Sequence, residues 1–549
     1  MTILAENQIT ADVYGQAYWL EAPTTFHGFV RSSYYAPGDT AQFSVDWNAP
    51  FTGEVWRLGW YGGGTNNARR VATITGTPTD QPAPTVIPDS NNALTCAAWT
   101  VNADWQIPVD AEPGAYHVVF RAAPNFGRAL FFVNNPAVKR PVAVVSSDAT
   151  WMAAYNHYGG KSSPYGGASL YGSTGAMAGG IENRSLCVSY DRPVVTHIGV
   201  AQTYFMNAEY SLIRFLDRFG LDYDPVTCEQ IDADPTILDG RELVVFAGHN
   251  EYISQRIWDK FRDLHNTDTR MINLSGNDFF WRTRHGVADH TDLTTHGRVM
   301  WCRKDTMNGP GAHVGGTPIV AGDWGGTWQD TRWAQRVEWS EQLWGDLFVS
   351  NGVRHDSLKV PAAYKSSPFW RDCPGVQALS EGQTYTFGPG SLGMEWDIPA
   401  GHAPKAYVSE TTVDLTGNAS DINGQYYNED ATPTHKAFLM ATEGGGAIFN
   451  GANVQHSWLL ADGHVGRYSD QIVDVNGQQS FLNLLADFGV EVPDPATVTA
   501  AGLTVPTPVA LSEYGLSDLT PADLADMEAW IGGVWIPVDA LGWEIAGAG

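Results

Sequence analysis

The segment His249-Asn250-Glu251 places an imidazole and a carboxylate two residues apart. In an extended segment, side chains at positions i and i+2 point to the same side, so His249 and Glu251 would face one point. An imidazole nitrogen beside a carboxylate oxygen suits a metal ion of borderline or hard character. The alternative is structural: Asn250 or Ser254 caps a following helix, Glu251 favours the positive end of its dipole, and His249 is a packed loop residue. The spacing alone leaves both interpretations open.

Residues 155–171 combine tyrosines with glycines, as in Tyr158-Gly159-Gly160, Tyr165-Gly166-Gly167 and the final Tyr171. Glycine lets the backbone approach a ligand closely. A tyrosine that ligates a metal does so as a phenolate, a hard anionic donor that favours ferric iron over zinc. The alternative for each tyrosine is ordinary packing within a loop.

Two further segments carry groups suited to proton transfer or charge stabilisation. Glu395 stands between Met394 and Trp396. A partly desolvated glutamate has a raised pKa, which suits general acid–base catalysis near neutrality. The alternative is a salt-bridged glutamate on a strand. Residues 298–304 predict a strand that ends in the cation Lys304, for which the alternative is a solvated surface position.

The elements that must position these residues alternate between strands and helices. Buried strands are predicted at 142–145, 243–247, 271–274 and 446–449, and helices at 208–219, 254–264 and 478–488. This alternation is typical of βαβ units around a mostly parallel sheet, where ligands bind at the carboxyl ends of the strands. Polar segments follow the four strands at 146–151, 248–252, 275–278 and 450–453. We therefore expect these segments to meet at one rim of the sheet.

The predicted fold is multidomain. Residues 1–138 carry short alternating runs at 41–47, 54–60, 116–120 and 129–133, separated by Gly, Pro and Asn, which predicts an immunoglobulin-like β-sandwich. Residues 139–490 are expected to form an α/β domain with a mostly parallel, glutamine-amidotransferase-like sheet. Residues 491–549 form a short C-terminal extension that packs on the body or on a partner subunit.

Bulk composition excludes several classes of function. The chain has 549 residues, 43% of them hydrophobic, and a net charge of −28, so phosphate backbones and anionic membrane surfaces are poor partners. The N-terminal segment lacks the features of a secretory signal, and no run of 18 or more apolar residues predicts a membrane span. Five scattered cysteines without a CxxC pair indicate reduced thiols and no thiolate metal site. We expect a cytoplasmic protein.

Several blocks, in order over roughly residues 140–490, resemble the N,N-dimethylformamidase large (beta) subunit family. They are Thr150-Trp151 with Tyr155-Asn156, Gly159-Gly160-Lys161-Ser162, Ser189-Tyr190-Asp191-Arg192-Pro193, Gly248-His249-Asn250-Glu251-Tyr252, Ser275-Gly276-Asn277 with Trp281-Arg282, Gly393-Met394-Glu395-Trp396-Asp397, and Gly444-Gly445-Gly446 through Ser457-Trp458. Residues 56–63 also resemble the module that precedes this domain in many relatives. The ordered set, rather than any one block, carries the resemblance.

The resemblance implies a mononuclear ferric iron held by a tyrosine, a histidine and a glutamate, with zinc as the less favoured metal. It places the last two ligands on His249 and Glu251. Tyr171 matches the tyrosine best, because the family's ligand lies a similar distance upstream of the His-x-Glu pair. Tyr165 and Tyr158 are the alternatives.

The resemblance also implies hydrolysis of small N-substituted amides, such as N,N-dimethylformamide to formate and dimethylamine. Glu395 matches the family's general base, and Asn277 and Lys304 match groups that hydrogen-bond the substrate oxygen or the oxyanion. The aromatic run 279–281 is expected to form an apolar wall for N-alkyl groups. A small partner subunit and assembly into a homo- or hetero-oligomer are also implied.

Two other classes of protein compete with this interpretation. A glutamine-amidotransferase-like enzyme of other specificity would need a cysteine nucleophile at a strand-to-helix turn, and the sequence predicts none there, with His249 after the strand instead. The second alternative is a non-catalytic, glycan-binding β-sandwich protein. For such a protein we would expect a secretion signal and no bound metal.

Overall fold

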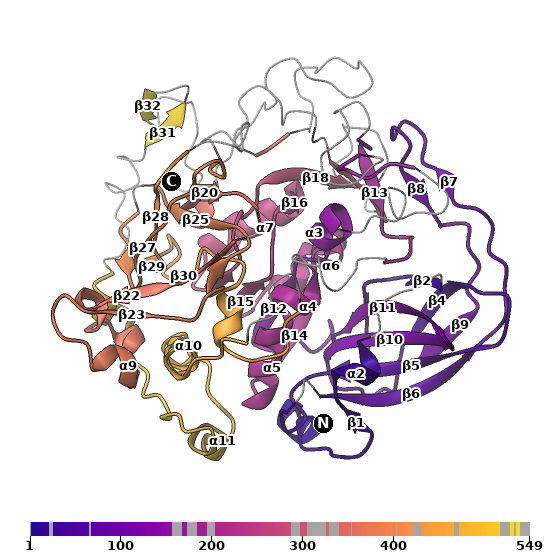
Figure 1. The fold of residues 1–549 in the computed structure, drawn as a ribbon, viewed down its shortest axis with the longest axis horizontal. Coiled ribbons are helices and arrows are strands. Elements are labelled where there is room, and N and C mark those ends of the chain that lie inside the picture. The colour runs from indigo at the N-terminus through magenta and orange to yellow at the C-terminus, as the bar shows by residue number, and fades with distance from the viewer. Residues whose placement is uncertain are drawn as a thin grey trace.

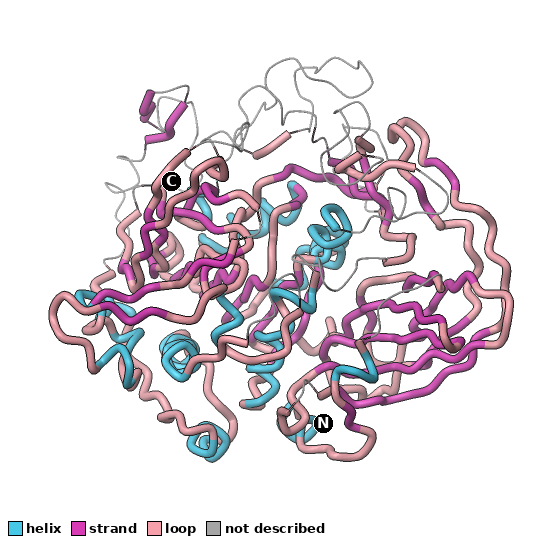
Figure 2. The backbone as a smooth tube through the Cα atoms, in the orientation of Figure 1, coloured by secondary structure: helices cyan, strands magenta, loops and turns pink. Residues whose placement is uncertain are grey.

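The structure of the protein, a computed structural model, is built of many β-sheets with few helices (Figures 1 and 2). It describes residues 2–20, 26–64, 67–155, 167–172, 184–194, 204–286, 297–302, 304, 326–328, 340–352, 354–401, 403–420, 430–465, 471–516, 528–531 and 534–537. Among these residues, no helix is long and apolar enough to cross a membrane.

The N-terminal region is β-rich, as its alternating sequence predicts. A six-stranded sheet has the order β1 (Val13–Tyr14), β6 (Ala68–Gly76), β5 (Phe51–Leu58), β10 (Gly114–Ala122), β11 (Asn125–Val133), β3 (Tyr34–Tyr35). A three-stranded sheet has the order β2 (His27–Val30), β4 (Thr40–Asp46), β9 (Ala103–Gln106). Apolar side chains from both sheets, including Phe43, Val118 and Phe131, share one buried cluster, because alternate residues of each strand face inward. The immunoglobulin-like topology stays a prediction.

A seven-stranded sheet forms the centre of the rest of the chain. Its order is β14 (Tyr223–Thr227), β12 (Val142–Ser146), β15 (Leu243–Ala247), β17 (Arg270–Leu274), β30 (Ala447–Asn450), β29 (Phe438–Ala441), β26 (Ala406–Tyr407). The first five strands run parallel, and β29 and β26 are antiparallel to their neighbours. The four strands that the sequence predicts are β12, β15, β17 and β30. The likeness to glutamine amidotransferases and the domain boundaries at 138 and 490 stay predictions.

The predicted helices lie within a few residues of the observed ones. They are α5 (Tyr210–Arg218), which follows α4 (Phe205–Ala208), together with α7 (Gln255–His265) and α10 (Val475–Asp487). Ser254 caps α7, since its hydroxyl accepts the backbone N–H of Ile257, which confirms the proposed capping role of this serine.

Three strands of the central sheet escaped prediction: β14, β29 and β26. β14 has the sequence Tyr-Asp-Pro-Val-Thr, in which Asp and Pro disfavour a strand, and α6 (Cys228–Ala233) follows it directly. The expectation that no cysteine occupies a strand-to-helix junction is therefore wrong, because Cys228 does. Burial raises the pKa of the Cys228 thiol well above its usual value, and its Sγ donates to the Ser146 carbonyl, so it is not an activated nucleophile.

Short sheets beyond the carboxyl ends of the parallel strands surround the candidate site. A four-stranded sheet has the order β13 (Cys187–Ser189), β19 (Val299–Cys302), β18 (Trp281–His285), β16 (Tyr252–Ser254). β20 (Asp346–Ser350) pairs with β25 (Trp396–Pro399), and β21 (His355–Asp356) with β24 (Leu392–Gly393).

The remaining described α-helices and strands are α1 (Ile3–Asn7), α2 (Gln16–Trp19), β7 (Thr85–Val86), β8 (Leu94–Thr95), α3 (Asp148–Thr150), α8 (Ser340–Leu343), β22 (Lys359–Pro361), α9 (Pro374–Gln377), β23 (Thr384–Thr386), β27 (Thr411–Thr412), β28 (Thr434–His435), α11 (Pro495–Ala500), β31 (Glu528–Ile531) and β32 (Val534–Pro537).

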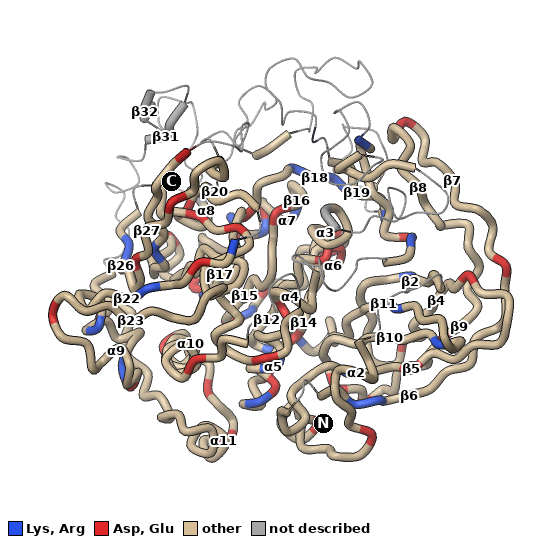
Figure 3. Tube along the Cα trace, in the orientation of Figure 1, with Lys and Arg blue, Asp and Glu red and all other residues tan. Residues whose placement is uncertain are grey.

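A buried ion pair joins the N-terminal sheet to the helices beside the central sheet. Arg57 on β5 and Asp217 on α5 lie 2.9 Å apart, and both side chains are fully buried. Asn7 on α1 also donates to Asp217, at 2.9 Å. Charged residues elsewhere are spread along the described trace in both regions (Figure 3). The contact between the two regions is therefore polar as well as apolar.

Candidate metal centre

His249 lies just beyond the carboxyl end of β15, at the rim where the sequence predicts polar segments to meet. Gly248 turns the chain with a φ of +87°, and a Cβ there would lie 2.5 Å from the Ser147 hydroxyl oxygen. The His249 backbone N–H donates to that hydroxyl at 3.2 Å, and the Asn250 N–H donates to the Ser275 hydroxyl at 2.9 Å. The segment is thus anchored to the chain that follows β12 on one side and β17 on the other.

His249, Glu251 and Glu395 form a buried cluster. The Nε2 atom of His249 lies 3.0 Å from Glu395 Oε2 and 3.8 Å from Glu251 Oε2. One ligand atom from each of the three lies within 4.8 Å of the others. Neither ring nitrogen of His249 makes an aligned hydrogen bond, although the side chain is buried. One nitrogen and two carboxylate donors in this arrangement suit a metal ion.

The charges in this cluster stabilise one another against burial. Burial lowers the pKa of His249, but the adjacent carboxylates of Glu395 and Glu251 outweigh it and raise the pKa above the usual value. Burial raises the pKa of Glu251, and the positive charges of Lys304 and His249 oppose this only in part. The site therefore concentrates charged groups at a place with little water.

Glu395 lies between β24 and β25, after Met394, whose φ is +60°. Asn277 Nδ2 donates to Glu395 Oε2 at 2.8 Å, and the Gly352 N–H lies 3.5 Å from Oε1. Burial favours a higher pKa, but His249 and Asn277 outweigh it, so the pKa of Glu395 is lowered. The raised pKa predicted from its apolar sequence neighbours is wrong, because the partners across the fold are polar.

Lys304 extends the cluster on the side of Glu251. Its Nζ lies 3.9 Å from Glu251 Oε1, donates to the hydroxyls of Tyr252 at 2.5 Å and Tyr171 at 3.1 Å, and lies 4.1 Å from the centre of the Trp281 ring. Burial lowers the pKa of Lys304 to about 8. The solvated surface position considered for this lysine is therefore wrong.

Tyr171 lies at the edge of this arrangement. Its hydroxyl lies 2.7 Å from that of Tyr252 and accepts a hydrogen bond from Lys304 Nζ, which in turn lies 3.9 Å from Glu251 Oε1. Its role as a metal ligand stays a prediction. The alternatives Tyr158 and Tyr165 lie outside the described residues.

The structure brings together residues that the sequence did not single out. Tyr252 belongs to the quoted His249–Tyr252 block, but only the fold places its hydroxyl against Lys304. Asp278, Asp346 and Asp397 form a second buried group of possible metal ligands. Asp278 ends the polar segment 275–278 and Asp397 ends the Gly393–Asp397 block, but sequence patterns assigned neither of them a role, and nothing in the sequence marks Asp346.

The aromatic run 279–281 divides between core and site. Phe279 packs against Trp258, Phe261 and Trp344, with ring centroids 5.4–5.6 Å apart. Phe279 therefore packs in the apolar core, and the apolar wall for N-alkyl groups stays a prediction. Trp281 is the member of the run that contacts Lys304.

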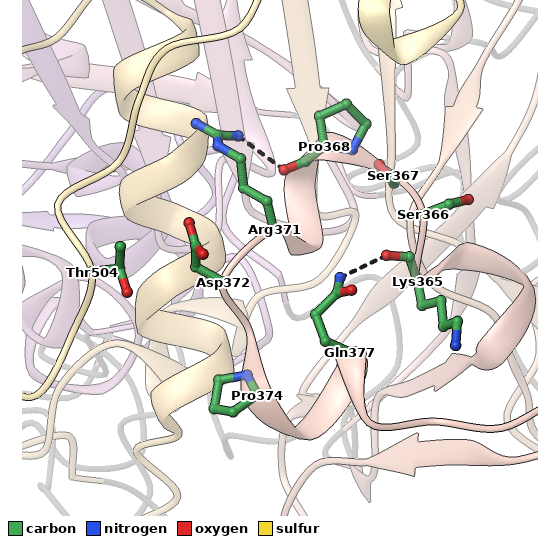
Figure 4. A pocket seen from close by; sticks show the side chains of 9 residues that line it. All are labelled: Lys365, Ser366, Ser367, Pro368, Arg371, Asp372, Pro374, Gln377 and Thr504. Atoms are coloured by element: carbon green, nitrogen blue, oxygen red, sulfur yellow. Dashed lines mark hydrogen bonds between the residues drawn. The ribbon is translucent and has the colours of Figure 1, made fainter.

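A surface groove of about 550 Å³ lies elsewhere (Figure 4). It is lined by Lys365, Ser366, Ser367, Pro368, Arg371, Asp372, Pro374, Gln377 and Thr504. Its cations have protein partners, since Arg371 pairs with Asp487 at 2.7 Å and Lys365 donates to the Leu379 carbonyl at 2.7 Å. The groove has no cluster of reactive groups comparable to that around His249.

Comparison with known proteins assigns the chain to a family. A family model described as N,N-dimethylformamidase beta subunit-like, C-terminal, matches residues 52–470, and the chain belongs to this family. Curated proteins gave no match. Among solved structures, an uncharacterized protein from Bacillus anthracis is 15% identical, over 21% of this chain and 85% of that one, with a TM-score of 0.15. So low a TM-score carries no argument about the fold.

Proposed function

We propose that this protein is an iron-dependent hydrolase of small N-substituted amides, such as N,N-dimethylformamide, with formate and dimethylamine as products. The observation that carries the proposal is the buried His249, Glu251 and Glu395 cluster, whose imidazole nitrogens make no aligned hydrogen bond, in a chain of this family. Zinc is the less favoured metal, because a tyrosine phenolate among the ligands favours ferric iron.

His249, Glu251 and Tyr171 would hold the ferric ion. His249 and Glu251 fit such an ion, since a buried imidazole without an aligned hydrogen bond lies beside carboxylates, and Tyr171 is assigned from the resemblance. Bound there, iron would act as a Lewis acid toward the amide carbonyl and lower the pKa of water. Glu395 is close enough to His249 to act as a further ligand or as the base, and the experiment below separates the two.

Glu395 is assigned as the general base. Asn277 holds its carboxylate by a 2.8 Å hydrogen bond, and its lowered pKa keeps it ionised near neutrality. It would take a proton from the attacking water and deliver it to the amine nitrogen as the C–N bond breaks.

Lys304 and Asn277 are assigned to the substrate oxygen. Lys304 Nζ is held by two tyrosine hydroxyls in a buried position, where a hydrogen bond to a developing oxyanion is strong. Trp281 beside it offers an apolar surface. A dialkylamide has no N–H, so an apolar neighbour costs it no hydrogen bond.

Paired variants at Glu395 and His249 test this function. Glu395→Gln should retain about one metal ion per chain but lose about 10²-fold or more in kcat, since the base is lost while the metal ligands remain. His249→Ala should lose the metal together with turnover. Elemental analysis, a visible tyrosinate-to-iron band and dimethylamine release are the measurements. Glu410→Gln, at a partly exposed glutamate paired with Lys436, is the matched control.

Two results would remove parts of the proposal. Loss of metal in Glu395→Gln would make Glu395 a ligand instead of the base. Equal amide hydrolysis before and after metal removal would end the metal-dependent mechanism.

The family description names a beta subunit, and we propose that the chain works with a small partner subunit in an oligomer. Light scattering on the purified protein, with and without co-expressed candidate subunits, tests this. A catalytically active monomer would contradict it.

A further inference from the structure

Three aspartates form a second buried cluster beside the candidate metal centre. Asp278 lies in the turn after β17, Asp346 begins β20, and Asp397 lies on β25. Each residue is at most 2% exposed. One carboxylate oxygen from each lies within 4.8 Å of the others. Segments far apart in the sequence thus bring three carboxylates to one point.

Two of these carboxylates keep an oxygen that accepts no aligned hydrogen bond, although Ser275 lies near Asp278, and Asp397 near Asp346. Asp278 Oδ2 accepts a 2.5 Å hydrogen bond from Asn273, and Asp346 Oδ2 accepts a 2.7 Å hydrogen bond from Asn450. The Oδ1 atoms of Asp278 and Asp346 are buried and accept no aligned hydrogen bond. A buried acceptor left unpaired is costly, so both oxygens are available to a ligand within the cluster.

The charge of the cluster also lacks a direct counterpart. Over the described ranges, none of the three aspartates forms an ion pair with lysine or arginine. Lys405 influences Asp346 from a distance, while its Nζ donates to the Ala400 carbonyl at 2.6 Å. Three adjacent carboxylates in a buried place need either a cation or bound protons, because their mutual repulsion is little screened there.

We propose that Asp278, Asp346 and Asp397 bind a hard divalent cation of the Mg²⁺, Ca²⁺ or Mn²⁺ class, at a site separate from the His249 cluster. The donor set is oxygen only, without imidazole or thiolate, and this is the set that such cations prefer. The His249 cluster contributes a nitrogen donor and so selects a different kind of metal.

A cation at the three aspartates would also support the catalytic groups. Asp397 Oδ1 accepts the Asn277 backbone N–H at 2.8 Å, and Asn277 in turn donates to Glu395. Asn277 has a φ of +53°, a conformation that needs such support. The cation would therefore act as a structural element that fixes the Asn277 turn.

Cation binding is best measured in His249→Ala, in which the first site is disabled. After treatment with EDTA, this protein should take up one equivalent of Mg²⁺, Ca²⁺ or Mn²⁺ by calorimetry and elemental analysis, with a rise in Tm. In His249→Ala/Asp346→Asn the same cation should bind about tenfold more weakly or not at all, since one of three charged ligands is lost. His249→Ala/Asp414→Asn removes an exposed aspartate and is the matched control; it should behave as His249→Ala does.

If Asp346→Asn fails to fold, Asp278→Asn takes its place, and the cation titration of His249→Ala still stands alone. The proposal is overturned if His249→Ala shows neither bound cation nor a Tm rise with any of the three ions up to about 10 mM. The aspartates would then hold protons. Because no readout uses amide hydrolysis, failure of the proposed enzymatic function would leave this result unaffected.

Discussion

Replacement of Gly276 by alanine tests how closely the chain segments of the site fit together. An added Cβ would lie 2.5 Å from the Glu395 carbonyl oxygen and 3.1 Å from the Trp396 Cα. Ordinary contact begins at 3.4 Å, so one segment must move by about 0.9 Å. The obstacle is backbone, which cannot rotate away as a side chain can. We expect Gly276→Ala to separate Glu395 from its partner Asn277.

The expected losses follow from the size of this shift. A misplacement of about 1 Å at a reacting group costs about 10²-fold in rate, so kcat/KM for N,N-dimethylformamide should fall by about that factor. Overpacking should lower the free energy of unfolding by about 1–3 kcal/mol. Steady-state kinetics, urea denaturation and metal analysis on one preparation measure both effects.

Gly489→Ala provides the control, since its φ is +82° and no atom lies within 4 Å of the added Cβ. It should cost about 1–2 kcal/mol of stability through backbone strain, with no change in kcat/KM. The reasoning is refuted if Gly276→Ala stays within about threefold of the wild-type rate, or if Gly489→Ala loses as much activity.

Three further substitutions probe the surroundings of the site. Tyr252→Phe removes a hydroxyl that accepts a hydrogen bond from the buried Lys304 ammonium. We expect kcat to fall and the free energy of unfolding, measured by urea denaturation, to fall by about 1–3 kcal/mol. Wild-type values of both quantities would exclude a positioning role for Tyr252. Asp217→Asn breaks the buried ion pair with Arg57 and should lower the free energy of unfolding by about 3–5 kcal/mol, measured by urea denaturation. A decrease of less than about 1 kcal/mol would contradict this prediction. Burial raises the pKa of Glu209 from 4.5 to about 7, so the folded state binds the extra proton between these values. The stability of the wild type relative to Glu209→Gln should therefore fall as pH rises from 4.5 to 7, and parallel pH curves would contradict this.

The sequence predicts best the strands that are mostly apolar and lie in the interior of the central sheet. β15 (Leu-Val-Val-Phe-Ala) is wholly apolar, β17 (Arg-Met-Ile-Asn-Leu) is apolar at three of its five positions, and both strands are buried on both faces, a pattern that indicates interior parallel strands. β14 was missed because its Asp224 and Pro225 are unusual in a strand. Asp224 is tolerated there because it forms a 2.6 Å ion pair with Arg241, a contact between residues that only the fold brings together.

The sequence predicted the convergence of site residues that are close to one another in the chain. It did not predict contacts between site residues that are far apart in the chain. His249 and Glu251 converge because they lie two positions apart along one segment, with one residue between them. Glu395 was placed near them by resemblance alone, and its pKa was predicted in the wrong direction, since its immediate neighbours are apolar while its spatial partners are His249 and Asn277. Electrostatics at a buried group depends on through-space contacts, which single-sequence patterns do not contain.

The His249 cluster and the aspartate cluster are built from the same chain segments. A structural change in one cluster therefore affects the other. Asn277 and Asp278 are adjacent, yet one contacts Glu395 and the other belongs to the aspartate group; Glu395 and Asp397 divide in the same way. A shift that relaxes repulsion among the aspartates therefore moves the Asn277–Glu395 hydrogen bond as well. Substitutions at Asp346, which touches neither Asn277 nor Glu395 by any hydrogen bond between described residues, separate the two effects most cleanly. A loss of turnover in Asp346→Asn would reach the Asn277–Glu395 pair through Asp397, which accepts the Asn277 backbone N–H, or through Asp278, the chain neighbour of Asn277.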